Sequence, residues 1–221
     1  MTDTRQTVTA VDPEDRFQFG KNWLRFVESL TDERMQKADA SLLEPLGLET
    51  LEGRTFLDIG SGSGLFSLAA RRLGATVHSF DYDPNSVKST ASLRERFFPN
   101  DSDWTVERGS ILDAHFVKSL GQHDIVYSWG VLHHTGHMWD AIQNARTTVA
   151  PGGMFYIALY NDCGKESERW VKLKKTYLSV PDLLKPLYIT ATWAPYEIRA
   201  FLGSLKRGNP GKYVRSWTQY Q

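Results

Sequence analysis

Three glycines at alternate positions form the segment of this chain best suited to binding a small molecule. The stretch from residue 56 to residue 64 reads FLDIGSGSG, so glycines occupy positions 60, 62 and 64. Because glycine lacks a Cβ atom, this backbone can turn tightly and approach a ligand closely. A helix that starts near Leu65 directs its free N–H groups toward the same space. The segment therefore predicts a site at which a ligand contacts the main chain.

The spacing of the glycines separates two classes of ligand, because a dinucleotide and S-adenosylmethionine both suit such a loop. The dinucleotide fingerprint is G-x-G-x-x-G. Here the third glycine comes one residue early, and Leu65 stands at the dinucleotide position. No Lys–Ser/Thr pair follows, which argues against a phosphate-binding P-loop. The loop thus favours S-adenosylmethionine over a nicotinamide cofactor.

A carboxylate farther along the chain suits a ribose. Asp81 ends the second apolar run, about twenty residues after Gly60, where a carboxylate at a strand tip accepts hydrogen bonds from ribose hydroxyls. The alternative is that Asp81 caps the helix that follows. Asp83 and Pro84 make a better helix start. We therefore assign ribose binding to Asp81 and the helix cap to Asp83.

Alternating strands and helices are expected to position these residues. Strands are predicted at Thr55–Ile59, Thr76–Phe80, Trp104–Val106, Asp124–Trp129 and Met154–Tyr160. The helices between them are predicted at Leu65–Leu73, Pro84–Phe97, Ala114–Leu120 and Met138–Val149. This alternation is typical of βαβ units, in which a parallel sheet carries helices on both faces. Ligands bind beyond the carboxyl ends of such strands, where the glycine loop and Asp81 fall.

The chain divides into four predicted parts. Residues 1–16 are expected to be a flexible N-terminus, and residues 17–50 to carry N-terminal helices, the first at 17–30. Residues 51–163 form the ligand-binding domain, and residues 164–221 form a basic, aromatic, helical tail. Helices of the tail are predicted at 165–177, 181–193, 195–205 and 213–220, with no further strand.

Five segments in this order resemble the motifs of class I S-adenosylmethionine-dependent methyltransferases. They are residues 56–64, 80–82, 109–113, 124–134 and 149–153. The resemblance covers roughly residues 17–162 and points to the ubiquinone-biosynthesis-like, small-molecule group. It implies an α/β, Rossmann-like, doubly wound, mostly parallel sheet of about five strands in the order 3-2-1-4-5. The family's last two strands have no counterpart here, so tail helices or a partner subunit are expected to cover the fifth strand.

The resemblance also implies residue roles. The cofactor-binding residues are Asp58, Gly60, Ser61, Gly62, Gly64, Asp81, Tyr82, Ser110, Ile111, Trp129 and Gly130. Asp58 would lie near the amino group of S-adenosylmethionine, and Tyr82 against its adenine. Ser110 and Ile111 would close the adenine pocket. Trp129 and Gly130 would border the methionine portion.

Two histidines follow the fourth predicted strand. Methyl transfer needs a base only if the acceptor must lose a proton, and imidazole titrates in a suitable range. We predict His134 or His133 as this base. The alternative is that one of them simply hydrogen-bonds loop backbone. The residues after the fifth strand, Tyr160, Asn161 and Asp162, are expected to line the acceptor pocket.

A metal site is not predicted near these histidines. His133, His137 and Asp140 could suggest a metal site, since the two histidines are four residues apart. Thr135 and Gly136 argue against a continuous helix there, and no third histidine or cysteine lies nearby. We therefore predict no metal ligand among these residues.

Charge and composition limit the compartment and the partners. The chain has 26 basic and 26 acidic residues, but residues 165–221 alone hold 11 basic against 4 acidic ones. This tail suggests an anionic or lipid-like substrate, although a face that packs on the sheet explains it as well. Only one cysteine, Cys163, is present, and the N-terminus lacks an apolar signal core, so a cytoplasmic protein is expected. No transmembrane segment and no DNA partner are predicted, and a homodimer stays open.

These observations predict an enzyme that methylates an oxygen, nitrogen or carbon atom of a small molecule by in-line displacement. One alternative is an RNA methyltransferase, which the basic tail favours but which lacks an Asn-Pro-Pro-Tyr type motif after the fourth strand. The other alternative is a non-catalytic, cofactor-binding subunit, which the missing strands favour.

Overall fold

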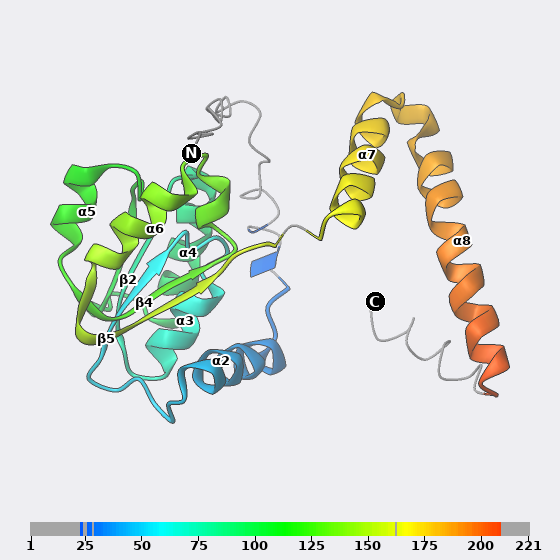
Figure 1. Cartoon of the computed structure of the whole chain (residues 1–221). Helices are drawn as coiled ribbons and strands as arrows, with labels where there is room; N and C mark the ends of the chain where they lie inside the picture. The colour runs from blue at the N-terminus through cyan, green and yellow to red at the C-terminus, as the bar shows by residue number, and fades with distance from the viewer. Residues whose placement is uncertain (1–22, 24–25, 28, 162, 209–221) are drawn as a thin grey trace. The chain divides into compact units, whose positions relative to one another are not determined.

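The computed structural model describes residue 23, residues 26–27, residues 29–161 and residues 163–208 (Figure 1). The chain forms two compact units, Met1–Tyr160 and Asn161–Gln221. The predicted flexible N-terminus (1–16) and the predicted last helix (213–220) lie outside the described residues. So does most of the predicted first helix, of which residues 23, 26 and 27 are helical.

The first unit is built on a sheet of five parallel strands. They are β1 (Thr55–Ile59), β2 (Thr76–Asp81), β3 (Trp104–Arg108), β4 (His123–Trp129) and β5 (Val149–Ala158). Their order in space is β3-β2-β1-β4-β5. This order confirms the predicted Rossmann-like fold. Within the described residues, β3 and β5 form the two edges of the sheet.

Helices cover both faces of this sheet (Figure 1). The α-helices of the unit are α2 (Asp32–Leu46), α3 (Leu65–Arg72), α4 (Pro84–Phe97), α5 (Ala114–Leu120) and α6 (Met138–Thr147). Neighbouring residues of β1 belong to different hydrophobic clusters. Phe56 packs in the cluster that contains Leu68 of α3. Leu57 packs in the cluster that contains Ala141 of α6. Because both faces are buried, the strands read as continuous apolar runs in the sequence.

Hydrogen bonds between side chains and backbone fix the register of the two central strands. Thr55 donates to the Asp124 carboxylate through its N–H and its hydroxyl, each at 2.8 Å. The Asp124 N–H donates in return to the Thr55 hydroxyl at 2.9 Å. At the other end of the strands, the Ser128 hydroxyl donates to the Ile59 carbonyl at 3.0 Å. The ends of β1 and β4 therefore lie side by side, which fixes the loops that follow them.

The last strand differs from its prediction. β5 begins five residues earlier than predicted and ends two residues sooner, and α6 ends at Thr147 rather than Val149. The Pro-Gly-Gly segment at 151–153 is typical of a turn, yet it belongs to β5 where the register with β4 shifts. A Cβ atom on Gly153 would lie 2.8 Å from the Asp124 carbonyl oxygen. Glycine thus lets this turn-like sequence run along β4.

The described part of the second unit is helical. It contains α7 (Lys165–Ser179), the short 3₁₀ helix η3 (Asp182–Leu184) and α8 (Lys185–Lys206). The prediction of separate helices at 181–193 and 195–205 was wrong, because α8 continues through Pro195. Proline removes one N–H donor from a helix, while the turns on either side keep their own hydrogen bonds. None of the described helices is long and apolar enough to cross a membrane.

Candidate functional site

The loop between β1 and α3 depends on glycine at two close approaches. All three of its glycines have positive φ angles. A Cβ atom on Gly60 would lie 2.4 Å from Cγ1 of Val131, and one on Gly64 would lie 2.7 Å from Cα of Thr90. The Gly60 N–H donates to the Phe80 carbonyl at 2.9 Å. The loop is therefore held against β2 in a conformation that side chains would disturb.

Hydroxyl groups of α4 support this loop from one side, a contact that was not predicted from the sequence. The Ser61 and Thr90 hydroxyls share a hydrogen bond of 2.9 Å. The Ser89 hydroxyl donates to the Ser63 carbonyl at 3.2 Å. Both α4 residues are buried, as is Ser86 one turn earlier. Small hydroxyl residues three and four positions apart lie on one helix face, and that spacing was the available signal.

Asp81 lies against the glycine loop, at the place predicted for a ribose carboxylate. Its Oδ2 atom accepts the Gly62 N–H at 3.0 Å, and its Oδ1 atom accepts the Asp83 N–H at 2.9 Å. Burial raises the pKa of Asp81, and these two N–H groups oppose that rise. A carboxylate is an acceptor-only group when ionised, with about four acceptor sites in total. Asp83 caps α4 as predicted and accepts the Asn85 N–H at 2.9 Å.

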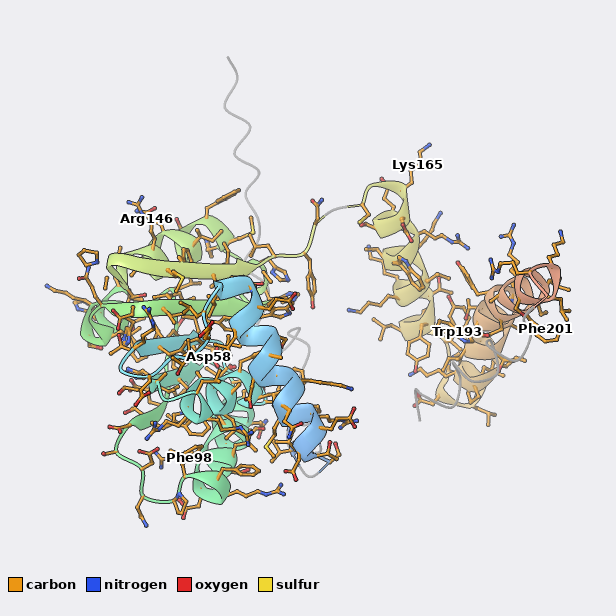
Figure 2. The ribbon with its side chains drawn as sticks, turned by 90° about the horizontal axis from the view of Figure 1, so that it is seen from below. Asp58, Phe98, Arg146, Lys165, Trp193 and Phe201 are labelled. Carbon is orange, nitrogen blue, oxygen red and sulfur yellow. The ribbon has the colours of Figure 1, made fainter. Side chains whose placement is uncertain are left out.

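Asp58 begins a buried polar chain that runs from β1 to β3 and that the sequence did not indicate. Asp58, which Figure 2 labels among the elements of the first unit, is only 3% exposed and accepts the Ser67 hydroxyl at 2.5 Å. Ser67 accepts the Ser79 hydroxyl at 2.8 Å, and Ser79 accepts the Trp104 indole N–H at 2.9 Å. Burial raises the pKa of Asp58 to about 7, and the charge of Asp81 adds to this rise. The Ser67 hydrogen bond opposes it.

Replacing Asp58 with asparagine should remove a pH dependence of stability. Folding raises the pKa of this carboxyl from 3.8 to about 7. The folded state therefore favours the protonated carboxyl, and the stability of the fold is highest below pH 3.8 and falls as the pH rises toward 7. Between about pH 4 and pH 7, the free energy of unfolding of the wild type should fall by roughly 2–4 kcal/mol relative to Asp58→Asn. Urea unfolding at several pH values measures this difference. If the free energies of unfolding of the wild type and of Asp58→Asn changed with pH by the same amount, the prediction would be contradicted.

The predicted adenine-pocket residues, Tyr82, Ser110 and Ile111, lie on two loops that meet. The Gly109 N–H donates to the last carbonyl of β2 at 3.1 Å, which joins the loop after β3 to the end of β2. The Tyr82 side chain is 48% exposed, and the Arg108 guanidinium lies 5.6 Å from its ring centre. Ser110 is partly exposed, whereas Ile111 is buried. All three residues thus lie at the carboxyl ends of the strands, the end of the sheet that carries the glycine loop.

Aromatic rings surround the end of β4. Trp129 is 52% exposed, and its ring stacks on those of Tyr156 at 6.0 Å and Phe66 at 6.3 Å. Gly130 follows with a φ of 73°, and its N–H donates to the Ala158 carbonyl at 2.9 Å. Trp129 and Gly130, the residues predicted to border the methionine portion, therefore lie where β4 and β5 both end.

Two histidines with adjacent rings follow β4 in the 3₁₀ helix η2 (Leu132–His134). The ring centres of His133 and His134 are 4.0 Å apart. Both ring nitrogens of His133 are buried and have no hydrogen-bond partner within the part of the chain that the structure describes. Burial lowers the pKa of His133, and the adjacent His134 lowers it further. His133 is therefore held as a neutral imidazole near pH 7.

The residues predicted to line the acceptor pocket follow β5. Tyr160 is 72% exposed, and its ring centre lies 4.4 Å from that of His133 and 5.6 Å from that of His134. Asn161 is exposed as well, and Asp162 lies outside the described residues. Tyr160 and the two histidines form one cluster beside the ends of β4 and β5.

Fold and site together define a class of protein. The strand order, the glycine loop after β1 and the aspartate that ends β2 are the architecture of class I S-adenosylmethionine-dependent methyltransferases. The cofactor of this class is S-adenosylmethionine. A model of the methyltransferase domain family matches residues 31–191, and the chain belongs to this family.

Curated relatives share part of the chain. It is 33% identical over 120 residues to the ubiquinone biosynthesis O-methyltransferase of Methylobacterium sp. (strain 4-46), which covers 53% of this chain and 45% of that relative. It is 31% identical over 118 residues to the ribosomal protein L11 methyltransferase of Bacillus cytotoxicus, which covers 47% of this chain and 38% of the relative. The chain thus spans less than half the length of these relatives. Since one is named for ubiquinone biosynthesis and the other for a ribosomal protein, the shared part does not identify the acceptor.

Solved structures share the fold. A candidate S-adenosyl-L-methionine-dependent methyltransferase from Methanococcus maripaludis matches with a TM-score of 0.52 at 15% identity, covering 94% of this chain and 87% of that one. A chain from the complex of the Haloferax volcanii Trm112 methyltransferase activator with its candidate methyltransferase matches with a TM-score of 0.52 at 20% identity. That match covers 69% of this chain and 64% of the other. Identities this low speak for the common fold alone.

Proposed function

We propose that this protein transfers a methyl group from S-adenosylmethionine to an oxygen, nitrogen or carbon atom of a small molecule by in-line displacement. The observation that supports this most directly is the Asp81 carboxylate, which lies at the end of β2 against the glycine loop and accepts the Gly62 N–H. At Gly60 and Gly64 the space that a side chain would need is filled by Val131 and Thr90, which keeps the loop in its turn beside Asp81. The residues present therefore fit the cofactor.

The chain's own residues would mainly bind and orient. When bound, the cofactor supplies a methyl group on a positively charged sulfur. We assign Asp81 to the ribose, Asp58 to the amino group, and Trp129 with Gly130 to the methionine portion. The adenine would lie among Tyr82, Ser110 and Ile111. Holding both reactants in line is the larger part of such catalysis.

Calorimetric titration of the folded protein with S-adenosylmethionine and with its demethylated product tests the binding half of this proposal. We expect micromolar-range affinity for both ligands. Transfer of a radiolabelled methyl group to a panel of small acceptors tests the catalytic half. Absence of heat from either ligand, with the protein shown to be folded, would contradict the proposal.

We further propose that His133 is the general base for an acceptor that must lose a proton. Its lowered pKa keeps the ring neutral at pH 7, and its nitrogens have no hydrogen-bond partner among the described residues. His134 is more exposed, and its ring centre lies 4.0 Å from that of His133. His134 therefore remains the second candidate, and its pairing with His133 disfavours protonation of both rings together.

Replacing His133 with alanine should lower kcat about 100-fold, the usual size of a general-base contribution. The affinity for the cofactor should stay the same, because the ring lies outside the glycine loop and Asp81. The wild-type rate should fall only on the acid side of the ordinary histidine pKa, since protonation removes the base. His134→Ala is the matched control and should lose much less activity. If both variants were as active as the wild type, neither histidine would be the base, and their role would be to form the loop.

Three predictions about the surroundings of the protein stand as proposals. The basic tail, with 11 basic and 4 acidic residues in 165–221, supports an anionic or lipid-like substrate. A homodimer and a cytoplasmic location are proposed on the sequence pattern alone. Analytical ultracentrifugation of the full chain tests the dimer. Neither the RNA methyltransferase nor the non-catalytic subunit is favoured by a contact in the described residues.

A further inference from the structure

The second unit exposes its apolar side chains. In residues 163–208 no apolar side chain is buried. The large apolar side chains that are more than half exposed are Trp170, Val171, Leu178, Leu183, Leu187, Ile189, Trp193, Ile198 and Leu202. A unit of this size normally needs a buried core to be stable. Exposed apolar side chains in this number indicate an interaction site where they lie together.

The turn between α7 and α8 concentrates this exposure. Four leucines lie within ten residues there: Leu178 is 65% exposed, Leu183 is 89%, Leu184 is 49% and Leu187 is 68%. Figure 1 shows this turn at one end of the helix pair, where α7 passes into η3 and α8. We call these four residues the leucine tip. Single leucines on a surface are ordinary, but a group at the end of a helix pair is not.

Basic side chains flank the leucine tip. Lys174 and Lys175 lie in the last turns of α7 and are exposed. Lys185, at the start of α8, pairs with Asp182 at 2.5 Å and lies 5.3 Å from the centre of the Tyr177 ring. Residues 163–208 carry nine lysines and arginines against four acids. The tip therefore combines apolar side chains with an excess of positive charge.

Aromatic rings lie behind the tip. A cavity of about 240 Å³ between α7 and α8 is lined by Trp170, Leu173, Lys174, Tyr177, Tyr188, Ile189, Thr192, Trp193 and Tyr196. Tryptophan and tyrosine rings are enriched at the headgroup level of membranes, because one end of the ring is apolar and the other polar. This cavity is formed by the parts of α7 and α8 that adjoin the leucine tip in the chain.

We propose that the leucine tip inserts into an anionic lipid surface, with its leucines among the acyl chains and the flanking lysines at the phosphates. Lipid headgroups complement the positive charge, and the hydrocarbon takes the exposed leucines. A second copy of the tip would bring like charges together instead. A nucleic acid would match the lysines but leave the leucines in water. This surface lies in the second unit and does not depend on the methyl transfer proposed for the first.

Sedimentation of the full chain with vesicles tests the insertion. Vesicles of phosphatidylcholine containing phosphatidylglycerol should bind the protein, and raising the salt concentration should weaken the binding. Vesicles of phosphatidylcholine alone should bind it about tenfold less. The double variant Leu183→Ser/Leu187→Ser should lose at least about tenfold in binding to the anionic vesicles. Lys174→Glu/Lys175→Glu should reduce it by a similar factor.

Leu205→Ser is the matched control, because Leu205 is 46% exposed and lies about 27 Å along α8 from Leu187. Its binding should equal that of the wild type. Equal binding to anionic and to neutral vesicles would overturn the proposal. Unchanged binding of Leu183→Ser/Leu187→Ser to anionic vesicles would overturn it as well. So would a concentration-dependent dimer that this double variant abolishes without any vesicle binding. Cofactor calorimetry on the same variants reports on the first unit and keeps failure of the two proposals separate.

Discussion

Replacing Gly64 with alanine should cost roughly 2–4 kcal/mol of unfolding free energy and abolish measurable binding of S-adenosylmethionine. Gly64 has a φ of 82°, in the left-handed region that costs alanine about 1–2 kcal/mol. The new Cβ atom would also lie 2.7 Å from Cα of Thr90. Since that contact is with backbone, α4 or the loop must move. Urea unfolding and calorimetry measure the two effects.

Gly47→Ala is the matched control for this change. Gly47 is also in the left-handed region, with a φ of 64°, but nothing lies within 4 Å of the position of its Cβ atom. It should show the conformational cost alone, about 1–2 kcal/mol, and bind the cofactor normally. If both variants lost the same unfolding free energy and bound S-adenosylmethionine equally well, the close approach of α4 to the loop would not be needed for cofactor binding.

Replacing Asp81 with alanine should weaken the binding of S-adenosylmethionine about 100-fold, because hydrogen bonds to a charged group contribute about 1.5–3 kcal/mol each. The change removes the acceptors proposed for the ribose hydroxyls. It also leaves the Gly62 N–H without its partner. Asp81→Asn should not restore affinity, since its amide keeps one accepting oxygen but places an NH₂ donor where the other oxygen now accepts a backbone N–H. Calorimetry with the demethylated product measures this without turnover.

The control for Asp81 lies two residues away. Asp83→Ala removes the cap of α4 and should cost about 1 kcal/mol of stability. Its backbone N–H remains, so the hydrogen bond to Oδ1 of Asp81 remains too. Affinity for the cofactor should therefore change little. Equal losses of affinity in the two variants would argue against a direct ribose contact by Asp81.

Most of the fold followed from local pattern. Each central strand is an apolar run because both faces of the sheet are buried, and Asp83 with Pro84 marks the start of α4 correctly. The wrong predictions of helix and strand bounds occurred where proline and glycine were taken to end a helix or to form a turn. Gly153 belongs to a strand because it lets β5 approach β4, and Pro195 lies inside a helix. In both places the surrounding structure outweighs the local preference of the residue.

The sequence indicated the parts of the candidate site whose spacing along the chain is characteristic. The glycine loop and Asp81 have characteristic spacing, so their approach could be expected. The support from Thr90 and the chain from Asp58 to Trp104 join residues from separate elements. No spacing rule connects such residues, because their contact depends on how the helices pack. His133 was predicted as a candidate base, but the burial of its ring nitrogens is visible only in the structure.

The bonds between β1 and β4 have a consequence for how the protein is made. Thr55 and Asp124 are 69 residues apart, as are Ile59 and Ser128. Closing a loop of that length is slow compared with forming a helix. A chain emerging from the ribosome can therefore form the glycine segment and α3 long before β4 arrives to hold them. We expect the ligand site to mature late, as one of the last events of folding.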